Sequence, residues 1–134
     1  MDFSDLNVNK CEKAKQLQQK WDIVIGDYYF DKSTTYGRKG GLATTGAVCV
    51  VDEKILIDVM QGDFVRSKSI WLPRQDQFQR LMNLNAPIEV INKINSFTDN
   101  NDPQGFASME QLWLAIYMRY EFNKLWDGNF WIVG

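Results

Sequence analysis

The sequence contains no histidine. This absence excludes Ser-His-Asp and Cys-His catalysis, zinc held by histidine, and imidazole general bases. Any catalysis would have to rest on carboxylates, lysine, tyrosine or a carboxylate-bound metal. Cys11 and Cys49 are the only cysteines, and they lack the CxxC spacing of zinc or redox sites. We therefore expect two free thiols rather than a disulfide, and no cofactor.

Long apolar runs and a large net charge are also missing. No run approaches the roughly 18 apolar residues of a membrane span, and the first fifteen residues lack the basic-then-apolar pattern of a secretory signal. We therefore expect a cytoplasmic protein with no membrane association. The formal net charge of −2 argues against a general DNA or RNA coat, which needs a strong cationic surplus. Nucleic acid is thus a less favoured partner.

The 134 residues suit one domain, residues 1–134, with a single core. Apolar residues at helical spacing predict a helix over 6–20. Between 22 and 72, β-branched and aromatic residues predict about four strands, with a loop over 32–46. The clearest predicted hairpin covers 47–60, and 64–72 is typical of an edge strand with a basic side.

Helical spacing returns after Leu72. The predicted helices cover residues 73–82, 88–97 and 109–126. Ser108 and Gln111 form a capping box before the last helix, which is apolar nearly all round and should be a buried or interface helix that Asp127-Gly128 ends. Residues 129–133 fit a final strand. The whole pattern predicts an α+β fold, in which an antiparallel sheet of four to five strands, curled or barrel-like, packs with N-terminal and C-terminal helices.

The loop from Tyr36 to Gly41 is the first candidate site. Its glycines allow backbone N–H groups to approach an anion, and Arg38 and Lys39 supply two cations. The loop lacks the spacing of a P-loop. The structural alternative is a hairpin loop whose charges serve solubility.

The second candidate is a basic group. Arg66 and Lys68 would share one face of a strand, and Arg74 would follow at a helix start, where an anion is favoured. Gln75 and Trp71 lie beside them in the sequence as a polar contact and a stacking surface. The alternative is a solvated edge strand protected from aggregation by charge.

Carboxylates and aromatic residues give weaker signals. Asp27, Asp58 and Asp63 could hold a metal or act as acid and base only if the fold brings them together, and chance spacing is the alternative. Aromatic residues exceed the needs of a core of this size, and partly exposed ones would suit an interface or a stacking pocket. The residues considered for partial exposure are Tyr28, Tyr36, Tyr117, Trp126 and Trp131.

Three motifs resemble those of small uncharacterised proteins from phages and prophages of Gram-positive bacteria. They are W-L-P-R-Q-D-Q, in a match over 70–82, E-Q-L-W-L-A followed by W-D-G-x-x-W, in a match over 108–131, and W-x-x-x-x-G-D at 21–27. The resemblance covers about half of the chain and implies a phage context, with the host cytoplasm as location. It carries no activity, and the loop at 32–46 has no counterpart in it.

The leading hypothesis is a non-catalytic phage accessory protein that binds a nucleotide-like small molecule or a host defence protein, with anti-defence as its role. Its ligand-binding residues would be drawn from Arg66, Lys68, Arg74, Gln75, Arg38, Lys39, Tyr36 and Trp71. A protein partner, or a second copy of the chain, would use the aromatic C-terminal segment. The alternative is a DNA-transaction factor in replication or packaging, with its cations on one face. An enzyme using the three aspartates is a third hypothesis.

Overall fold

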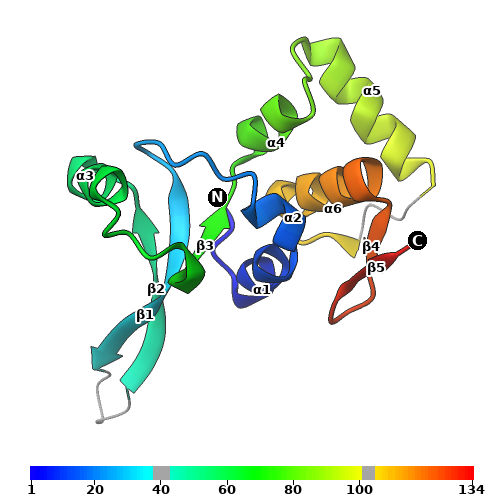
Figure 1. The fold of residues 1–134 in the computed structure, drawn as a ribbon. Coiled ribbons are helices and arrows are strands. Elements are labelled where there is room, and N and C mark those ends of the chain that lie inside the picture. Colours follow the sequence, from blue (N-terminus) through cyan, green and yellow to red (C-terminus); the bar gives the residue numbers. More distant parts are fainter. Residues whose placement is uncertain (38–42, 101–104) are drawn as a thin grey trace. The chain divides into compact units, whose positions relative to one another are not determined.

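The computed structural model describes residues 1–37, 43–100 and 105–134, without the side chains of 34–37 and 43–45 (Figure 1). The chain forms two compact units, which are described separately below. Unit 1 comprises Met1–Ala14 and Pro73–Gly134, and unit 2 comprises Lys15–Leu72. The α+β class is confirmed. The expectation of a single domain stays a prediction, because a compact unit is not necessarily an independently folding domain.

Unit 2 is built on an antiparallel sheet of three strands. These are β1 (Tyr28–Gly37), β2 (Ala43–Val50) and β3 (Ser69–Leu72), in the order β2-β1-β3. The edge position expected for the last strand is confirmed, although a 3-10 turn, η1 (Arg66–Lys68), replaces its first half. The loop predicted over 32–46 is wrong in part, because β1 continues to Gly37 and β2 begins at Ala43.

The hairpin predicted over 47–60 is wrong, because helix α3 (Glu53–Gln61) follows β2. The Asp52 side chain accepts a hydrogen bond from the N–H of Ile55 at 2.8 Å, which satisfies a donor of the first helical turn. Gly62 ends the helix in the left-handed region, at φ 80°. A short apolar run fits the strand period and the helix period equally well, so the cap at Asp52 decides between them.

Aromatic side chains form the core of unit 2. The rings of Trp21 and Trp71 stack with centroids 6.2 Å apart, and Phe64 meets Trp21 and Tyr29 edge-on at 5.9 and 5.5 Å. Such pairs add to the free energy gained by burying their large apolar surface. The edge strand therefore contributes one of its largest side chains, Trp71, to the interior of the sheet.

Unit 1 is mainly helical. Its helices are α1 (Asp5–Lys13), α4 (Gln75–Leu81), α5 (Pro87–Thr98) and α6 (Met109–Phe122), and its strands are β4 (Lys124–Trp126) and β5 (Trp131–Val133). Helix α6 is the core element, since every residue from Glu110 to Met118 is buried. This confirms the buried helix expected from its apolar composition. The helix predicted over 6–20 breaks at Ala14, and its last part is the short α2 (Lys15–Gln18) of unit 2.

The end of α6 differs from the prediction. Asn123, in the left-handed region at φ 52°, ends the helix, and the following residues form β4. Asp127 instead makes the turn into β5, where its Oδ1 accepts the N–H groups of Asn129 and Phe130, both at 2.7 Å. The W-D-G-x-x-W motif is therefore a hairpin, and the predicted final strand is confirmed as β5.

A polar network ties the start of the chain to α6. Asp2 Oδ2 accepts hydrogen bonds from Ser108 Oγ at 2.5 Å and from Gln111 Nε2 at 2.8 Å. Ser108 caps α6 by accepting the N–H of Gln111, as predicted. The Gln111 side chain, however, binds Asp2 and Lys10 instead of completing a reciprocal capping box. Among the described residues, no helix has the length and apolar character needed to cross a membrane.

Candidate ligand-binding site

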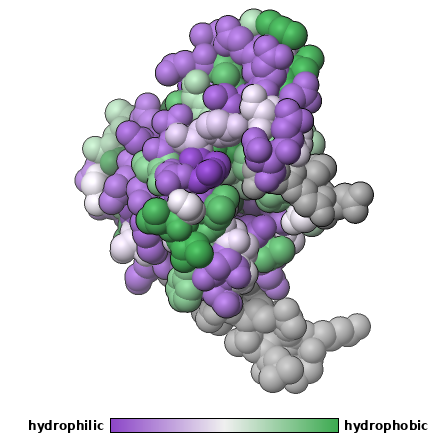
Figure 2. Space-filling model, turned by 90° about the vertical axis from the view of Figure 1, so that its right-hand side faces the viewer, coloured by the Kyte–Doolittle hydropathy of each residue, from purple (hydrophilic) through white to green (hydrophobic). Residues whose placement is uncertain are grey.

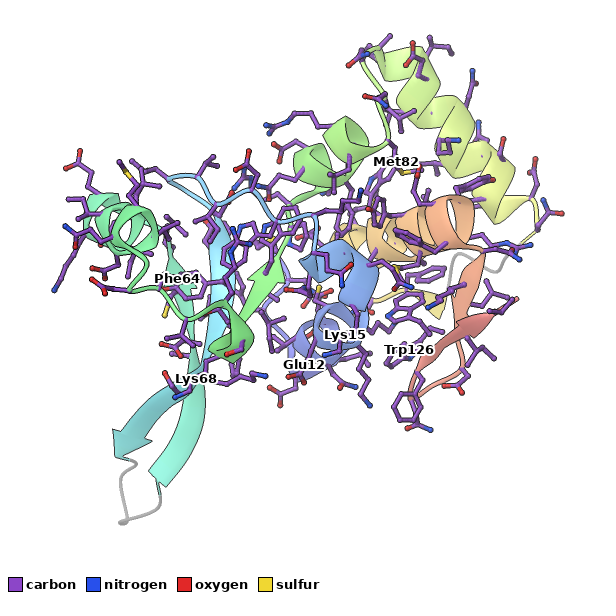
Figure 3. All side chains as sticks on the ribbon, viewed as in Figure 1. Glu12, Lys15, Phe64, Lys68, Met82 and Trp126 are labelled. Atoms are coloured by element: carbon purple, nitrogen blue, oxygen red, sulfur yellow. The ribbon has the colours of Figure 1, made fainter. Side chains whose placement is uncertain are left out.

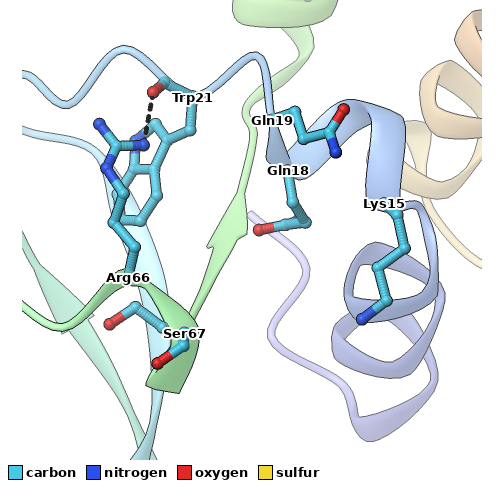
Figure 4. Close-up of a pocket in the computed structure, with 7 residues that line it drawn as sticks. Lys15, Gln18, Gln19, Trp21, Arg66 and Ser67 are labelled. Carbon is cyan, nitrogen blue, oxygen red and sulfur yellow. Dashed lines mark hydrogen bonds between the residues drawn. The ribbon is translucent and has the colours of Figure 1, made fainter.

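A hollow of about 450 Å³ opens on unit 2 between α2 and η1 (Figure 4). Its lining residues are Lys15, Gln18, Gln19, Trp21, Arg66, Ser67 and Ser69. Figure 4 shows Arg66 and Ser67 on the η1 side, and Lys15, Gln18 and Gln19 on the α2 side. The hollow therefore lies between two short elements that are distant in sequence.

Arg66 is held in place by the backbone of Trp21. Its Nη1 donates to the Trp21 carbonyl at 2.9 Å, and its guanidinium lies 5.8 Å from the centre of the Trp21 ring. One bond to a neutral acceptor leaves the charge and most of the five guanidinium N–H groups available. The geometry thus orients Arg66 without neutralising it.

Asp27 holds Trp21 in turn. The fully buried Asp27 carboxylate accepts hydrogen bonds at one oxygen from Trp21 Nε1 at 2.9 Å and from the N–H of Val24 at 3.0 Å. Gly26, at φ 93°, makes the tight turn that brings Asp27 back to Trp21. The W-x-x-x-x-G-D motif therefore has a structural role, since its Asp27 holds the Trp21 side chain in place beside the hollow.

Gln18 fastens α2 to the edge of the sheet. Its Oε1 accepts the Trp71 N–H at 2.7 Å, and its Nε2 donates to the Trp71 carbonyl at 3.0 Å. The side-chain amide thus replaces the backbone of a further strand. The neighbouring Lys15 and Gln19 are exposed and are carried to the hollow by this attachment.

The electrostatics of the hollow favour an anion. In the part of the chain that the structure describes, neither Lys15 nor Arg66 forms an ion pair with a carboxylate. Ser67 and Gln19 add exposed polar groups beside them. Two uncompensated cations with neutral donors are the groups that bind phosphate or carboxylate oxygens.

The structure separates the basic residues predicted from the sequence. Arg66 lines the hollow, whereas Lys68 is exposed on the same turn but does not line it. Figure 3 shows the labelled Lys68 apart from Lys15. The expectation that Arg66 and Lys68 share a strand face is wrong, because both lie in η1. Trp71 is buried in the aromatic core, so it offers no stacking surface to solvent.

Arg74 and Gln75 belong to unit 1, where they support α4 and α6. Arg74 is the N-cap residue of α4, and its Nε pairs with Asp76 at 3.1 Å. Asp76 also pairs with Arg80, four residues on, at 2.5 Å. Gln75 Nε2 donates to the buried Glu110 at 3.4 Å, so it joins two of the three motifs.

The W-L-P-R-Q-D-Q motif contains the start of helix α4. Gln77 is buried, and its Oε1 accepts the N–H of Arg74 at 2.9 Å, which is one of the two hydrogen bonds of a capping box. The Arg74 guanidinium has no acceptor, so it cannot form the reciprocal bond. Arg74 and Gln77 thus take part in the helix start, and Gln75 contacts a buried residue of α6. A ligand role for Arg74 and Gln75 stays a prediction.

Several other predicted residues cannot be placed in the hollow. Arg38 and Lys39 lie outside the described residues, and of Tyr36 only the backbone, in β1, is described. Of the aromatic residues considered for exposure, Tyr117 and Trp131 are buried, while Tyr28 and Trp126 are half-buried. The candidate site therefore retains Arg66 from the predicted set.

The three aspartates considered as metal ligands or acid–base residues lie in different parts of unit 2. Asp27 is engaged beneath the hollow, Asp58 lies within α3, and Asp63 is exposed after that helix. Within the described ranges, no group of three or more Asp, Glu or Cys side chains could hold a metal ion. The hypothesis of a metal-dependent enzyme therefore gains no support from the arrangement of these residues.

Lys15, Gln18 and Gln19 were not identified as site residues from the sequence. The available signal was their polar spacing at i, i+3 and i+4, which places them on one side of a helix end. That spacing also fits the ordinary solvent-exposed side of a surface helix. Only the tertiary attachment through Trp71 distinguishes the two.

A larger hollow of about 630 Å³ lies on unit 1. Its lining residues are Ser96, Phe97, Asn100, Arg119, Tyr120, Asn123 and Leu125. The guanidinium of Arg119 donates to the Asn123 side chain, which places it at the end of α6. The hollow has a single cationic lining residue and contains none of the predicted site residues, so we favour the hollow of unit 2.

The fold and the site together define an α+β protein with a small basic hollow. Comparison of the chain with protein-family models, with curated proteins and with solved structures gives no match.

Proposed function

We propose that the protein is a non-catalytic binding protein that takes a phosphate-bearing, nucleotide-like ligand in the hollow between α2 and η1. The observation that carries the proposal is the pair of cations, Lys15 and Arg66, without a carboxylate partner among the described residues. Phosphate oxygens would accept from the guanidinium of Arg66 and the ammonium of Lys15.

The size and the rigidity of the hollow support this ligand class. A volume of about 450 Å³ lies within the range of small-molecule sites. Both walls are anchored, one through Gln18 and Trp71 and the other through Arg66 and Trp21. A site that is already ordered loses less conformational entropy when it binds its ligand.

The biological role that we propose is that of a phage accessory protein which sequesters a nucleotide signal of host defence. This role rests on the phage resemblance of the three motifs and on the anionic preference of the hollow. The DNA-transaction alternative would need several cations on one surface, whereas within unit 2 Lys15 and Arg66 line the hollow and Lys68 does not. We therefore favour a small anionic ligand.

The test is isothermal titration calorimetry of the full chain with a panel of cyclic nucleotides, ADP-ribose and inorganic phosphate. We expect at least one nucleotide to bind. In Arg66→Gln and Lys15→Gln, loss of a charge-assisted hydrogen bond should weaken that binding by about tenfold or more.

Lys68→Gln is the matched control, because it removes the same charge from η1 without altering the lining of the hollow. Its affinity should stay within about twofold of the wild type, because a rim charge contributes little. Absence of binding by every member of the panel would overturn the proposal, as would an equal loss in all three variants. Thermal unfolding of each variant separates loss of the site from loss of the fold.

A further inference from the structure

Helix α3 carries an apolar face that the rest of unit 2 does not bury. None of its nine residues is buried, although five are apolar. Ile57 is 52% exposed and Met60 is 78% exposed, and their spacing places them on one side of the helix. Both ends are capped, by Asp52 and by Gly62. The helix is thus formed in advance and presents Ile57 and Met60 outward, while its other three apolar residues, Ile55, Leu56 and Val59, are half-buried.

Further exposed apolar residues flank α3 within unit 2. Val24 and Ile25 precede Gly26, whose N–H donates to the Val51 carbonyl at 2.8 Å, just before the Asp52 cap. Val50 and Val65 are also exposed, one before and one after the helix. Single exposed apolar residues are ordinary, but a group of them around one amphipathic helix is typical of an interaction surface.

The charges of the segment 52–63, which contains α3 and its N-cap, are predominantly negative. Asp52, Glu53, Asp58 and Asp63 stand against one lysine, Lys54, which gives the segment a formal charge of −3 (four negative and one positive). Asp58 lies on the side of the helix away from Met60, because two residues span about 200° of a helix. Acidic side chains at the border of an apolar face attract a surface of opposite charge and repel one of the same charge. The local charge therefore carries information about the partner.

We infer that α3 docks as a short amphipathic helix onto another protein that presents an apolar groove bordered by lysine or arginine side chains. Ile57 and Met60 occupy the groove, and the carboxylates contact its basic border. Helix-in-groove recognition uses anchors at this spacing. The inference is independent of the ligand proposed for the hollow between α2 and η1.

Two other occupants fit the charges less well. A second copy bound about a two-fold axis would bring the same carboxylates against one another. An anionic membrane surface would repel them. A basic-bordered protein groove satisfies both the apolar residues and the acidic ones.

A second exposed apolar face, on α5, serves as a control. Ile88 is 61% exposed and Ile91 is 52% exposed, and Figure 2 shows hydrophobic atoms at the top of the view, where α5 lies in Figure 1. Its charged residues, Glu89 and Lys93, balance each other, and its C-cap Asp99 gives a formal charge of −1 against −3 for the segment of α3. The charge of this face therefore indicates much less about a partner.

The experiment measures binding of a fluorescein-labelled synthetic amphipathic peptide by fluorescence anisotropy with the full chain. The probe is a helical Leu/Lys peptide, and the matched peptide has Glu in place of every Lys. We expect the Leu/Lys peptide to bind about tenfold more tightly than the Leu/Glu peptide at low salt, with the difference reduced at about 0.5 M salt. The double variant Ile57→Ser/Met60→Ser should weaken binding by about tenfold, because two apolar contacts are lost.

The double variant Ile88→Ser/Ile91→Ser should leave this affinity unchanged. Because the α3 variant could disturb unit 2, Glu53→Gln/Asp63→Asn provides a second test that keeps the apolar face. This double variant removes two exposed carboxylates and should weaken only the salt-dependent part of the binding. Equal binding of both peptides, or equal losses in the α3 and α5 variants, would overturn the inference. Two other results would also overturn it. One is a wild-type dimer in sedimentation velocity that becomes monomeric in the α3 variant. The other is binding of the full chain to neutral phosphatidylcholine vesicles that is lost in the α3 variant.

Discussion

Asp27 should be the polar residue on which unit 2 depends most. Replacing it with alanine removes the single oxygen that accepts both Trp21 Nε1–H and the N–H of Val24, at 2.9 and 3.0 Å. A buried donor left without an acceptor costs about 1–3 kcal/mol. The indole N–H is buried, whereas the Val24 N–H is only part-buried and water can replace its acceptor. We therefore expect Asp27→Ala to lower the free energy of unfolding by about 3 kcal/mol.

The geometry also predicts how a conservative change behaves. Both hydrogen bonds reach the same carboxylate oxygen, and an asparagine amide oxygen can accept both. Asp27→Asn should therefore cost only about 1 kcal/mol, as a charged acceptor becomes a neutral one. Asp22→Ala, at an exposed aspartate of the same segment, should change stability by less than about 0.5 kcal/mol.

The assay is urea unfolding followed by circular dichroism and by tryptophan fluorescence. A double-mutant cycle with Trp21→Phe isolates the indole–carboxylate pair, and we expect a coupling free energy of about 1.5 kcal/mol. The reasoning would be refuted if Asp27→Ala and Asp27→Asn cost the same, or if Asp27→Ala cost no more than Asp22→Ala.

Two further predictions concern unit 1. Gln77→Ala should lower the free energy of unfolding by about 1 kcal/mol, because the N–H of Arg74 loses its acceptor. Gln79→Ala on the same helix is the control and should lower it less. Equal free energies for the two variants in urea unfolding would contradict the capping role of Gln77. Burial acts to raise the pKa of Asp2, but hydrogen bonds from Ser108, Ser4 and Gln111 outweigh it and lower this pKa to about 2 from the ordinary 3.8. Because the folded-state pKa is depressed, the stabilisation is present above pH 3.8 and is lost as the pH falls toward 2. The stability difference between wild type and Asp2→Asn should therefore shrink across this interval, and a difference independent of pH would exclude the linkage.

The elements predicted correctly from the sequence are those whose local pattern of apolar residues fits only one kind of secondary structure. Helix α6 is apolar nearly all round, and only burial suits such a helix, so its place in a core followed directly. Helix α3 was misread because Ile55, Ile57 and Val59 alternate like a strand, while Ile55, Leu56, Val59 and Met60 follow the helix period equally well. The N-cap at Asp52 decides between the two periods, and the predicted hairpin over 47–60 left it out of account.

Only one of the two cations of the candidate site could be predicted from the sequence. Arg66 was identified from its charge, but its counterpart Lys15 comes from a helix whose position depends on the Gln18–Trp71 hydrogen bonds. A contact between segments so far apart in sequence has no local signature. Arg74 shows the reverse case, since its charge and position suggested a ligand site while its neighbours form a helix cap.

The amide of Gln18 has a consequence for self-association through the sheet. An open edge strand offers unpaired N–H and C=O groups to the edge of another molecule, which is a route to fibrillar aggregation. At Trp71, both groups of the outer edge of β3 are already satisfied by Gln18. The residue that shapes one wall of the hollow therefore also acts as a gatekeeper, and Gln18→Ala should increase the tendency of the protein to form amyloid-like assemblies on storage.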